Sequence, residues 1–429
     1  MIKPTSLLLA VLLSTGSLAF ANSFFKPGPS VPGNLPRDQV YPRGSAFLFT
    51  FYSVGGGPHL KEGEGELMFS EAELDKLFRE YHATGFRVFG PQYELKERSL
   101  QDAAKYGLKT VYTVGLPVKF TKEQVVIEEN KLTEEITRQI KELANDPNIA
   151  VWDLRPEEIR PWRKNEILYL NTAAAAIKAA DPLKRPIYHY IPGHASAQRM
   201  IPIAKQVDLL GKGMYTNYSG MKQSRVWCRW TIEQEIAAIK EANSQAVPVA
   251  VPEMFQQPPD EELPLIPSWV RHDVYLSLVS GAKGILVFSL RQRDNFTAWE
   301  PYYRAYRQIG RELLGPDRLA DVFLFGEPRN DLAIKVVSGP AEVEMNFPVG
   351  GVKEPVRYPS VAFLNTAFEN ARYLFLVNSA NEAVEVAIDG IPSKAKATDL
   401  LAEKREPATS LAKVSLKPLE VRAYRITQP

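Results

Sequence analysis

Four consecutive apolar runs in the middle of the chain decide the fold: NIAVWDL (148–154), RPIYHYIP (185–192), VDLLGKGMYT (207–216) and VPVAVPEMF (247–255). Each run is rich in β-branched or aromatic residues and is nearly continuous rather than alternating, as buried parallel strands are. Helical segments with apolar residues at i, i+3 and i+4 lie between them, such as RKNEILYLNTAAAAIKAADP (163–182). Strands that alternate with helices in this way pair in parallel.

Four further runs of the same kind complete a set of eight: SAFLFTFYS (45–53), GFRVFGPQY (85–93), LKTVYTVG (108–115) and AKGILVFSL (282–290). Eight strand–helix units match a (β/α)₈ TIM barrel, whose usual size is about 250 residues. The alternative is a doubly wound open sheet, which usually carries a GxGxxG turn after its first strand. The glycine run at 55–57 lacks that spacing, so the barrel is favoured.

The pattern changes near Gly315-Pro316. Short β-rich runs bounded by Gly, Pro, Asn and Asp follow, among them SVAFLNTAF (360–368) and LEVRAYRIT (419–427). They predict an antiparallel β-sandwich. The expected organisation is therefore a barrel over 44–315 and a β-sandwich accessory domain over 316–429.

The N-terminal segment MIKPTSLLLAVLLSTGSLAFA (1–21) has the pattern of a signal peptide: Lys3, a leucine-rich core and a small-x-small cleavage site. Its apolar core is shorter than the roughly 20 residues that span a bilayer. We expect cleavage before Asn22, followed by a proline-rich arm over 22–43. The predicted location is the bacterial periplasm or the medium, with no membrane span in the mature chain.

Composition excludes several classes of function. The chain of 429 residues has 52 Lys and Arg against 50 Asp and Glu, so no basic surface for nucleic acid is predicted. The single cysteine, Cys228, and five histidines without HExxH spacing provide no recognisable metal site. No phosphate-binding GxxxxGK[ST] motif is present. We therefore predict no metal and no cofactor.

The chemistry of a TIM barrel lies at the carboxyl ends of its strands. Here those positions carry neutral polar and aromatic side chains, which suit a polyhydroxylated neutral ligand, and tryptophans in nearby loops could stack on sugar rings or simply pack. The predicted substrate partner is therefore a carbohydrate. The candidate substrate-binding residues are Tyr52, Gln92, Tyr93, Tyr190, His194, Tyr215, Asn217, Trp227, Arg291 and Gln292.

Carboxylates follow the fourth and seventh runs, and cleavage of a glycosidic bond needs such a pair. Glu253 ends a buried strand, where a carboxylate is costly unless it is hydrogen-bonded or functional, and an ion pair with Arg291 is the structural alternative. Glu157 and Glu158 share one loop. One of the two could be structural, paired with Arg155 or Arg160; Glu158 is the preferred general acid/base and Glu157 is the reserve.

The order of elements resembles secreted bacterial glycoside hydrolases that have a (β/α)₈ barrel and a C-terminal β-sandwich, and YLFLVN (373–378) resembles a strand of their accessory domains. Glu at the ends of strands 4 and 7 resembles the large retaining clan, which implies Glu158 as acid/base and Glu253 as nucleophile. That clan usually has Asn before the strand-4 Glu, whereas Pro156 and Glu157 stand here.

The implied function is hydrolysis of a glycosidic bond in an oligo- or polysaccharide. A carbohydrate-binding barrel without catalysis and a polysaccharide lyase are the alternatives. A lyase acting on acidic polysaccharide would need a basic cleft, which the arginines of the barrel loops could supply.

Overall fold

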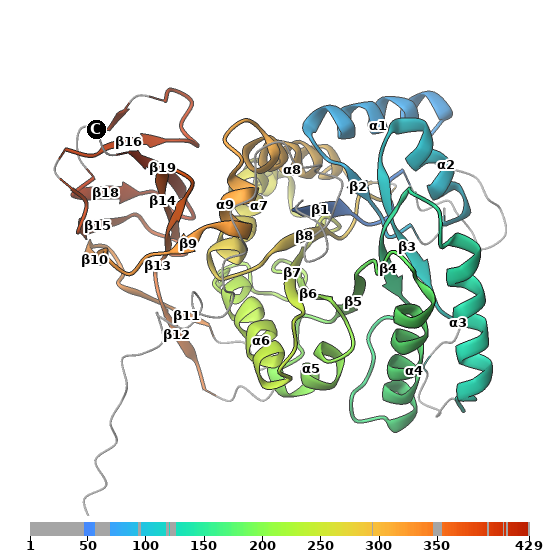
Figure 1. Ribbon diagram of the computed structural model, residues 1–429. Helices are drawn as coiled ribbons and strands as arrows, with labels where there is room; N and C mark the ends of the chain where they lie inside the picture. Colours follow the sequence, from blue (N-terminus) through green and yellow to red (C-terminus); the bar gives the residue numbers. More distant parts are fainter. Residues whose placement is uncertain are drawn as a thin grey trace, which may run out of the picture.

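The computed structural model describes residues 47–55, 69–92, 96–116, 120, 126–293, 295–345, 354–392, 394–405, 407–408 and 411–427. The predicted signal peptide (1–21) and proline-rich arm (22–43) lie outside these residues and stay predictions. The described chain forms a barrel of parallel strands surrounded by helices, with a separate group of antiparallel sheets beside it (Figure 1). The predicted fold class is confirmed.

The eight predicted runs form one parallel sheet in the order β1-β8-β7-β6-β5-β4-β3-β2. Two backbone hydrogen bonds bring its first and last strands together, from Gly90 N to Phe51 O and from Ser53 N to Pro91 O, both 2.9 Å. The barrel strands are β1 (Leu48–Phe51), β2 (Val88–Phe89), β3 (Lys109–Val114), β4 (Ile149–Leu154), β5 (Ile187–Ile191), β6 (Leu209–Met214), β7 (Val247–Pro252) and β8 (Gly284–Val287).

Helices follow the strands and cover the outside of the barrel (Figure 1). The sequence signals mark their ends well where capping is strong. Ser70 accepts the N–H of Glu73, and the Glu73 carboxylate accepts the N–H of Ser70 at 2.7 Å, which is a capping box. The helices are α1 (Glu71–Thr84), α2 (Lys96–Tyr106), α3 (Glu129–Leu143), α4 (Lys164–Ala180), α5 (Ala197–Ala204), α6 (Trp227–Glu241), the 3₁₀ turn η1 (Asp260–Leu265), α7 (Ile266–Val279), α8 (Trp299–Leu314) and α9 (Leu319–Phe325).

The C-terminal region contains three antiparallel sheets, with strand orders β17-β16-β19-β14-β13-β9, β10-β15-β18 and β11-β12. Leu374 and Leu376 from the first sheet share one buried core with Val386 and Ile388 from the second, which makes a sandwich. Its strands are β9 (Glu327–Pro328), β10 (Ala333–Ser338), β11 (Glu342–Met345), β12 (Val356–Pro359), β13 (Val361–Phe368), β14 (Ala371–Asn378), β15 (Val384–Asp389), β16 (Lys396–Asp399), β17 (Pro407–Ala408), β18 (Lys413–Leu416) and β19 (Val421–Thr427).

The barrel and the sandwich share a continuous apolar core. Tyr275 on α7, Phe323 on α9 and Phe375 on β14 pack together, with ring centroids 4.4 to 6.5 Å apart. Helix α9 lies at this junction (Figure 1) and was not expected, because nearly all its residues are buried and it shows no amphipathic period. No helix within the described part of the chain is long and apolar enough to cross a membrane.

Candidate functional site

The barrel interior is filled by large side chains that glycines on β6 accommodate. A Cβ atom on Gly211 would lie 2.4 Å from the ring of Tyr188, and one on Gly213 would lie 2.7 Å from the hydroxyl oxygen of Tyr190. The alternating glycines of LLGKGM therefore make room for the two tyrosines of β5. Tyr190 can then occupy the carboxyl-terminal mouth of the barrel.

A pocket of about 650 Å³ opens at this mouth. Its walls are mostly aromatic, and two carboxylates on the loop after β4 contribute to one side. The lining residues are Glu157, Glu158, Tyr190, Pro192, Gly193, His194, Tyr215, Tyr218, Ser219, Trp227, Phe255 and Phe288. They include no Arg or Lys among the residues that the structure describes.

The aromatic walls offer flat apolar faces. The rings of Tyr190 and Tyr215 are stacked with their centroids 6.2 Å apart. Phe255 meets Tyr215 edge to face at 5.0 Å, and Phe288 meets Phe255 in the same way at 5.6 Å. Tyr218 extends this cluster outward and is 66% exposed. Apolar ring faces with hydroxyls at their edges match the alternating apolar and polar surface of a sugar.

The two acidic residues of the β4 loop differ in their surroundings. Glu158 is exposed and has a positive φ of 62°, an uncommon backbone conformation for a residue with a side chain. Glu157 is half-buried, and its Oε1 lies 3.2 Å from Nη1 of Arg155. Burial raises the pKa values of the Tyr190 and Tyr215 hydroxyls, and the negative charge of Glu157 raises both further. The charge of Glu157 therefore affects the ionisation of two tyrosines in the aromatic wall.

Glu253 follows β7 and is only 4% exposed. Its Oε1 accepts the backbone N–H of Asn217 at 2.6 Å, and its Oε2 accepts that of Tyr218 at 3.1 Å. Burial raises the pKa of this carboxyl to about 7, although the two N–H groups and the charge of Arg225 act in the opposite direction. The carboxylate does not line the described pocket, but Phe255, two residues further on, does.

A fourth acid of this region lies at the end of β4. Asp153, near the end of β4, is 2% exposed, and its Oδ2 accepts the hydroxyl hydrogen of Thr113 at 2.9 Å. Burial raises its pKa to about 7, while Arg155 and Thr113 partly offset that effect. Asp153 is thus a buried, hydrogen-bonded neighbour of the Glu157 loop.

The structure separates the predicted substrate-binding residues into two groups. Four of them line the pocket together with both glutamates of the β4 loop: Tyr190, His194, Tyr215 and Trp227. Burial, with the nearby charges of Arg199 and Lys212, lowers the pKa of His194, so its imidazole is neutral near pH 7.

The others lie elsewhere. The Tyr52 hydroxyl bonds that of Tyr188 at 2.8 Å inside the barrel, and Gln92 donates to the backbone oxygen of Val54 at 2.8 Å. Asn217 lies in the loop after β6, and its side chain is bonded to Tyr302 on α8 and to Arg225 in the turn before α6. Arg291 and Gln292 are half-buried after β8, and none of these residues lines the pocket. Tyr93 lies outside the described residues.

Sequence reasoning missed Phe255 and Phe288 as pocket residues. Both lie in apolar runs, where an aromatic side chain is expected to belong to the hydrophobic core. Of the tryptophans considered for sugar stacking, Trp162 is 63% exposed with Arg199 over its ring, and Trp230 is buried under Lys212. Parity along a strand separates inward from outward side chains, but Tyr188 and Tyr190 share parity and only Tyr190 lines the pocket, so the sequence carried no signal that distinguished mouth from core.

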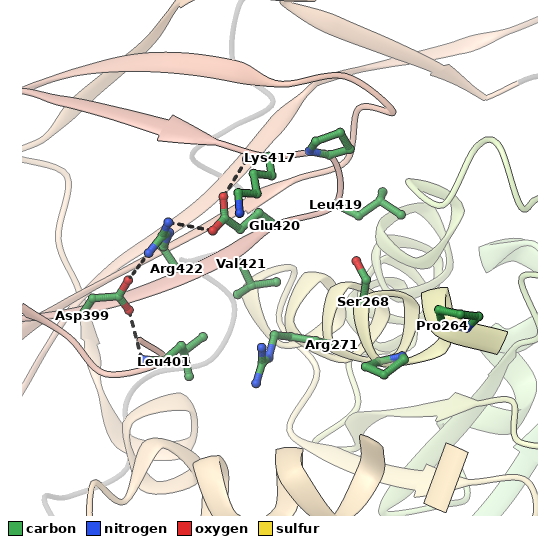
Figure 2. Close-up of a pocket in the computed structure, with 12 residues that line it drawn as sticks. Pro264, Ser268, Arg271, Asp399, Leu401, Lys417, Leu419, Glu420, Val421 and Arg422 are labelled. Carbon is green, nitrogen blue, oxygen red and sulfur yellow. Dashed lines mark hydrogen bonds and ion pairs between the residues drawn. The ribbon is translucent and has the colours of Figure 1, made fainter. Parts of the chain in front are cut away.

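A second cavity, of about 360 Å³, lies between α7 and the sandwich (Figure 2). Arg271 and Arg422 reach it, but they pair with Glu312 and with the carboxylates of Asp399 and Glu420. No aromatic ring lines this cavity. It lacks the stacking surface of the mouth pocket, which is therefore the candidate site. Among the described residues, no cluster of three or more His, Cys, Asp or Glu side chains could hold a metal ion.

Comparison with known proteins identifies the fold. No family model matches the chain, and no curated protein matches it in sequence. Among solved structures, an Anoxybacillus α-amylase aligns with a TM-score of 0.54 and 10% identity over 89% of this chain and 98% of that chain. An α-amylase from Geobacillus thermoleovorans in complex with acarbose aligns with a TM-score of 0.53, 10% identity and the same coverage of both chains.

A GH42 β-galactosidase from G. stearothermophilus aligns with a TM-score of 0.52 and 9% identity, covering 87% of this chain and 98% of that chain. The resemblance thus extends over both the barrel and the C-terminal sheets. It establishes a shared architecture, since identities near 10% carry no information about individual side chains. The predicted likeness to glycoside hydrolases therefore holds at the level of the fold.

Proposed function

We propose that this protein is a glycoside hydrolase that acts on a neutral oligo- or polysaccharide in the mouth pocket. The observation that carries the proposal is the pairing of the Glu157-Glu158 loop with an aromatic wall at the carboxyl end of a (β/α)₈ barrel. The structural neighbours, named as amylases and a β-galactosidase, support it by their shared architecture.

Glu158 is the proposed general acid/base. It lines the pocket and is exposed, whereas Oε1 of Glu157 lies 3.2 Å from Nη1 of Arg155. A general acid must reach the glycosidic oxygen, so the accessible Glu158 suits that role better than the ion-paired reserve, Glu157.

Glu253 is the proposed nucleophile of a retaining reaction. Two adjacent residues of one loop cannot flank a sugar ring from opposite sides, so the second carboxylate must come from elsewhere. Glu253 is bonded to the backbone N–H of Tyr218, a residue that lines the pocket. Each oxygen of Glu253 accepts one N–H and keeps a second lone pair, so attack on the anomeric carbon requires a local movement that exposes one of these buried oxygens to the pocket.

Glu158→Gln and Glu253→Gln test these roles on aryl glycosides and on unactivated oligosaccharides. We expect E158Q to lose turnover on oligosaccharides but to retain part of it on aryl glycosides, whose leaving groups need little protonation. E253Q should lose turnover on both classes. Glu300→Gln, on the exposed first turn of α8, is the matched control. Full activity of E253Q, or inverted product configuration by NMR, would refute the assigned mechanism.

One observation favours a second candidate, a barrel that binds carbohydrate without cleaving it. Both oxygens of Glu253 are bonded to backbone N–H groups, and the carboxyl group is covered. In that case calorimetry should show that wild-type protein and E253Q bind neutral oligosaccharides equally well. The wild type should release no reducing ends. The lyase alternative has less support, because the described lining lacks the arginine or lysine that would bind a uronate.

Export to the periplasm or the medium is proposed on the N-terminal pattern alone. Mass spectrometry of protein from the expressing bacterium tests it: a mature chain starting at Asn22 is expected, and a retained 1–21 segment would overturn it.

A further inference from the structure

We propose that the C-terminal sandwich fixes one wall of the mouth pocket through a buried chain of side chains, Ser379–His272–Asp273–Arg225. These four are positioning residues for the loop after β6, which carries Tyr215, Tyr218 and Ser219 of the pocket. The consequence for catalysis rests on the proposed function, whereas the structural coupling itself does not.

The first part of the chain crosses the interface between the two domains. Ser379 follows β14 of the sandwich, and its Oγ lies 3.0 Å from Nε2 of His272 on α7. Nδ1 of the same imidazole lies 2.9 Å from Oδ1 of Asp273. The three residues are at most 5% exposed. The sandwich therefore contacts α7 through a buried polar group as well as through apolar packing.

The protonation states of His272 and Asp273 determine which group donates each hydrogen bond. Burial lowers the pKa of His272, although Asp273 opposes that effect, so the imidazole is neutral near pH 7. Burial raises the pKa of Asp273, but Arg225 and His272 outweigh it and the net pKa is lowered, which leaves an ionised acceptor. Nδ1–H must then donate to Asp273, and Nε2 must accept from the Ser379 hydroxyl.

This Ser–His–Asp order resembles a nucleophilic triad in its contacts alone. Ser379 is 4% exposed and lines neither of the two cavities described above. A nucleophile must reach a substrate, so the arrangement supports structure at this position.

The second part joins α7 to the pocket loop. Nε of Arg225 donates to Asp273 at 2.9 Å, with a second contact from its Nη2, and its Nη1 donates to Oδ1 of Asn217 at 2.9 Å. The Thr216 hydroxyl donates to Oδ2 of Asp273 at 3.1 Å. Asp273 thus holds two successive residues of the loop, one directly and one through Arg225.

The loop is held on its other side by the barrel. The backbone N–H groups of Asn217 and Tyr218 donate to Glu253, and Nδ2 of Asn217 donates to the hydroxyl of Tyr302 on α8. Loosening of the Asp273 side therefore leaves Glu253 and Tyr302 to hold the loop. The backbone amides of Asn217 and Tyr218, which Glu253 binds, therefore report whether the Ser379–His272–Asp273–Arg225 chain is intact.

The test perturbs the end of the chain farthest from the pocket, because removal of one partner from the buried Arg225–Asp273 pair could prevent folding. Ser379→Ala leaves Nε2 of His272 without its donor. Hydrogen–deuterium exchange of full-length protein should then show the amides of Asn217 and Tyr218 exchanging about fivefold to tenfold faster. Ser379→Thr keeps a hydroxyl and should restore slow exchange.

Tyr275→Phe is the matched control. It removes a hydrogen bond from Tyr275 to Glu312, 3.1 Å long, on the same helix and at the same domain interface, but with no link to the pocket loop. This variant should leave exchange of the two reporter amides unchanged. Thr216→Val breaks the chain from the loop side and should reproduce the effect of S379A, which keeps the test decisive if S379A folds poorly.

In steady-state kinetics on an aryl glycoside, S379A should lower kcat about fivefold while Y275F leaves it unchanged. Hydrogen exchange tests the structural coupling, and kinetics test the proposed function. If wild-type protein shows no glycosidase activity but S379A accelerates loop exchange, the coupling stands and the proposed function falls. If S379A and T216V both fold and leave the two amides as protected as in wild type, or if Y275F accelerates them equally, the coupling is wrong.

Discussion

Replacement of Glu253 by Gln should flatten the dependence of stability on pH. Burial raises the pKa of this carboxyl from its ordinary value of 4.5 to about 7 in the folded protein. Between these two values the folded state holds more protons than the unfolded state, so stability is greatest below the lower value and is lost as pH rises through the upper one. The linkage relation gives a loss of about 2–3 kcal/mol between pH 5 and pH 8 from this one group.

The E253Q variant lacks this titration. Its absolute stability should also fall by about 1–3 kcal/mol, because the amide nitrogen of Gln cannot accept one of the two backbone N–H groups now bonded to the carboxylate. Gln does not titrate, so this position contributes no pH dependence to the stability of E253Q. The informative quantity is therefore the difference between pH 5 and pH 8, compared across the two proteins.

Urea denaturation followed by tryptophan fluorescence measures this difference. The wild type should lose about 2–3 kcal/mol more than E253Q over the interval. Asp153, whose pKa is also raised to about 7 by burial, titrates in both proteins and cancels. Glu300→Gln on the exposed turn of α8 should behave as the wild type. Equal pH dependence in wild type and E253Q would show that Glu253 is ionised across the whole interval, and the reasoning from burial would be refuted.

Three further predictions follow from local geometry. Ser70→Ala removes the capping box of α1 and should lower the midpoint of urea denaturation by an amount equivalent to about 1 kcal/mol; an unchanged midpoint would contradict it. Gly213→Ala places a Cβ 2.7 Å from the Tyr190 hydroxyl and should weaken oligosaccharide binding in calorimetry about tenfold, whereas Gly107→Ala, at a positive φ of 65° with no atom near its Cβ, should lower stability and leave binding unchanged. Trp152→Phe loses the 2.9 Å bond to Asp181 and the Arg185 contact, and denaturation should show a loss of about 2 kcal/mol, whereas exposed Trp162→Phe should change stability little.

The barrel was predictable because its strands are buried on both faces. Such strands carry continuous apolar runs, and all eight runs became strands of one parallel sheet. Helices with a strong cap and a clear apolar period, such as α1, were predictable for the same reason. Helix α9 was not: its sequence LADVFLF is buried almost all round at the domain junction, so nothing in its pattern separates it from a strand.

The mouth of the barrel was predictable as a place, but its lining was not. Strand ends gave Tyr190 and Tyr215 correctly as pocket residues, along with the Glu157-Glu158 loop. They also gave Tyr52 and Gln92, whose polar groups instead form hydrogen bonds inside the barrel to Tyr188 and Val54. A difference of one layer along a strand separates a residue that lines the pocket from one that fills the core, and register between neighbouring strands sets that layer.

Glu253 shows where such reasoning stops. The cost of burying a carboxylate required that it be bonded, and the sequence offered Arg291 as its ion-pair partner. The bonds come instead from backbone N–H groups of the loop after β6, and the charge that favours ionisation comes from Arg225. Both depend on how Asp273 on α7 holds that loop, and Asp273 is in turn bonded to His272 and through it to the sandwich. The state of one barrel residue is therefore set partly by a domain whose sequence begins more than sixty residues later, a dependence that strand-end positions alone do not contain.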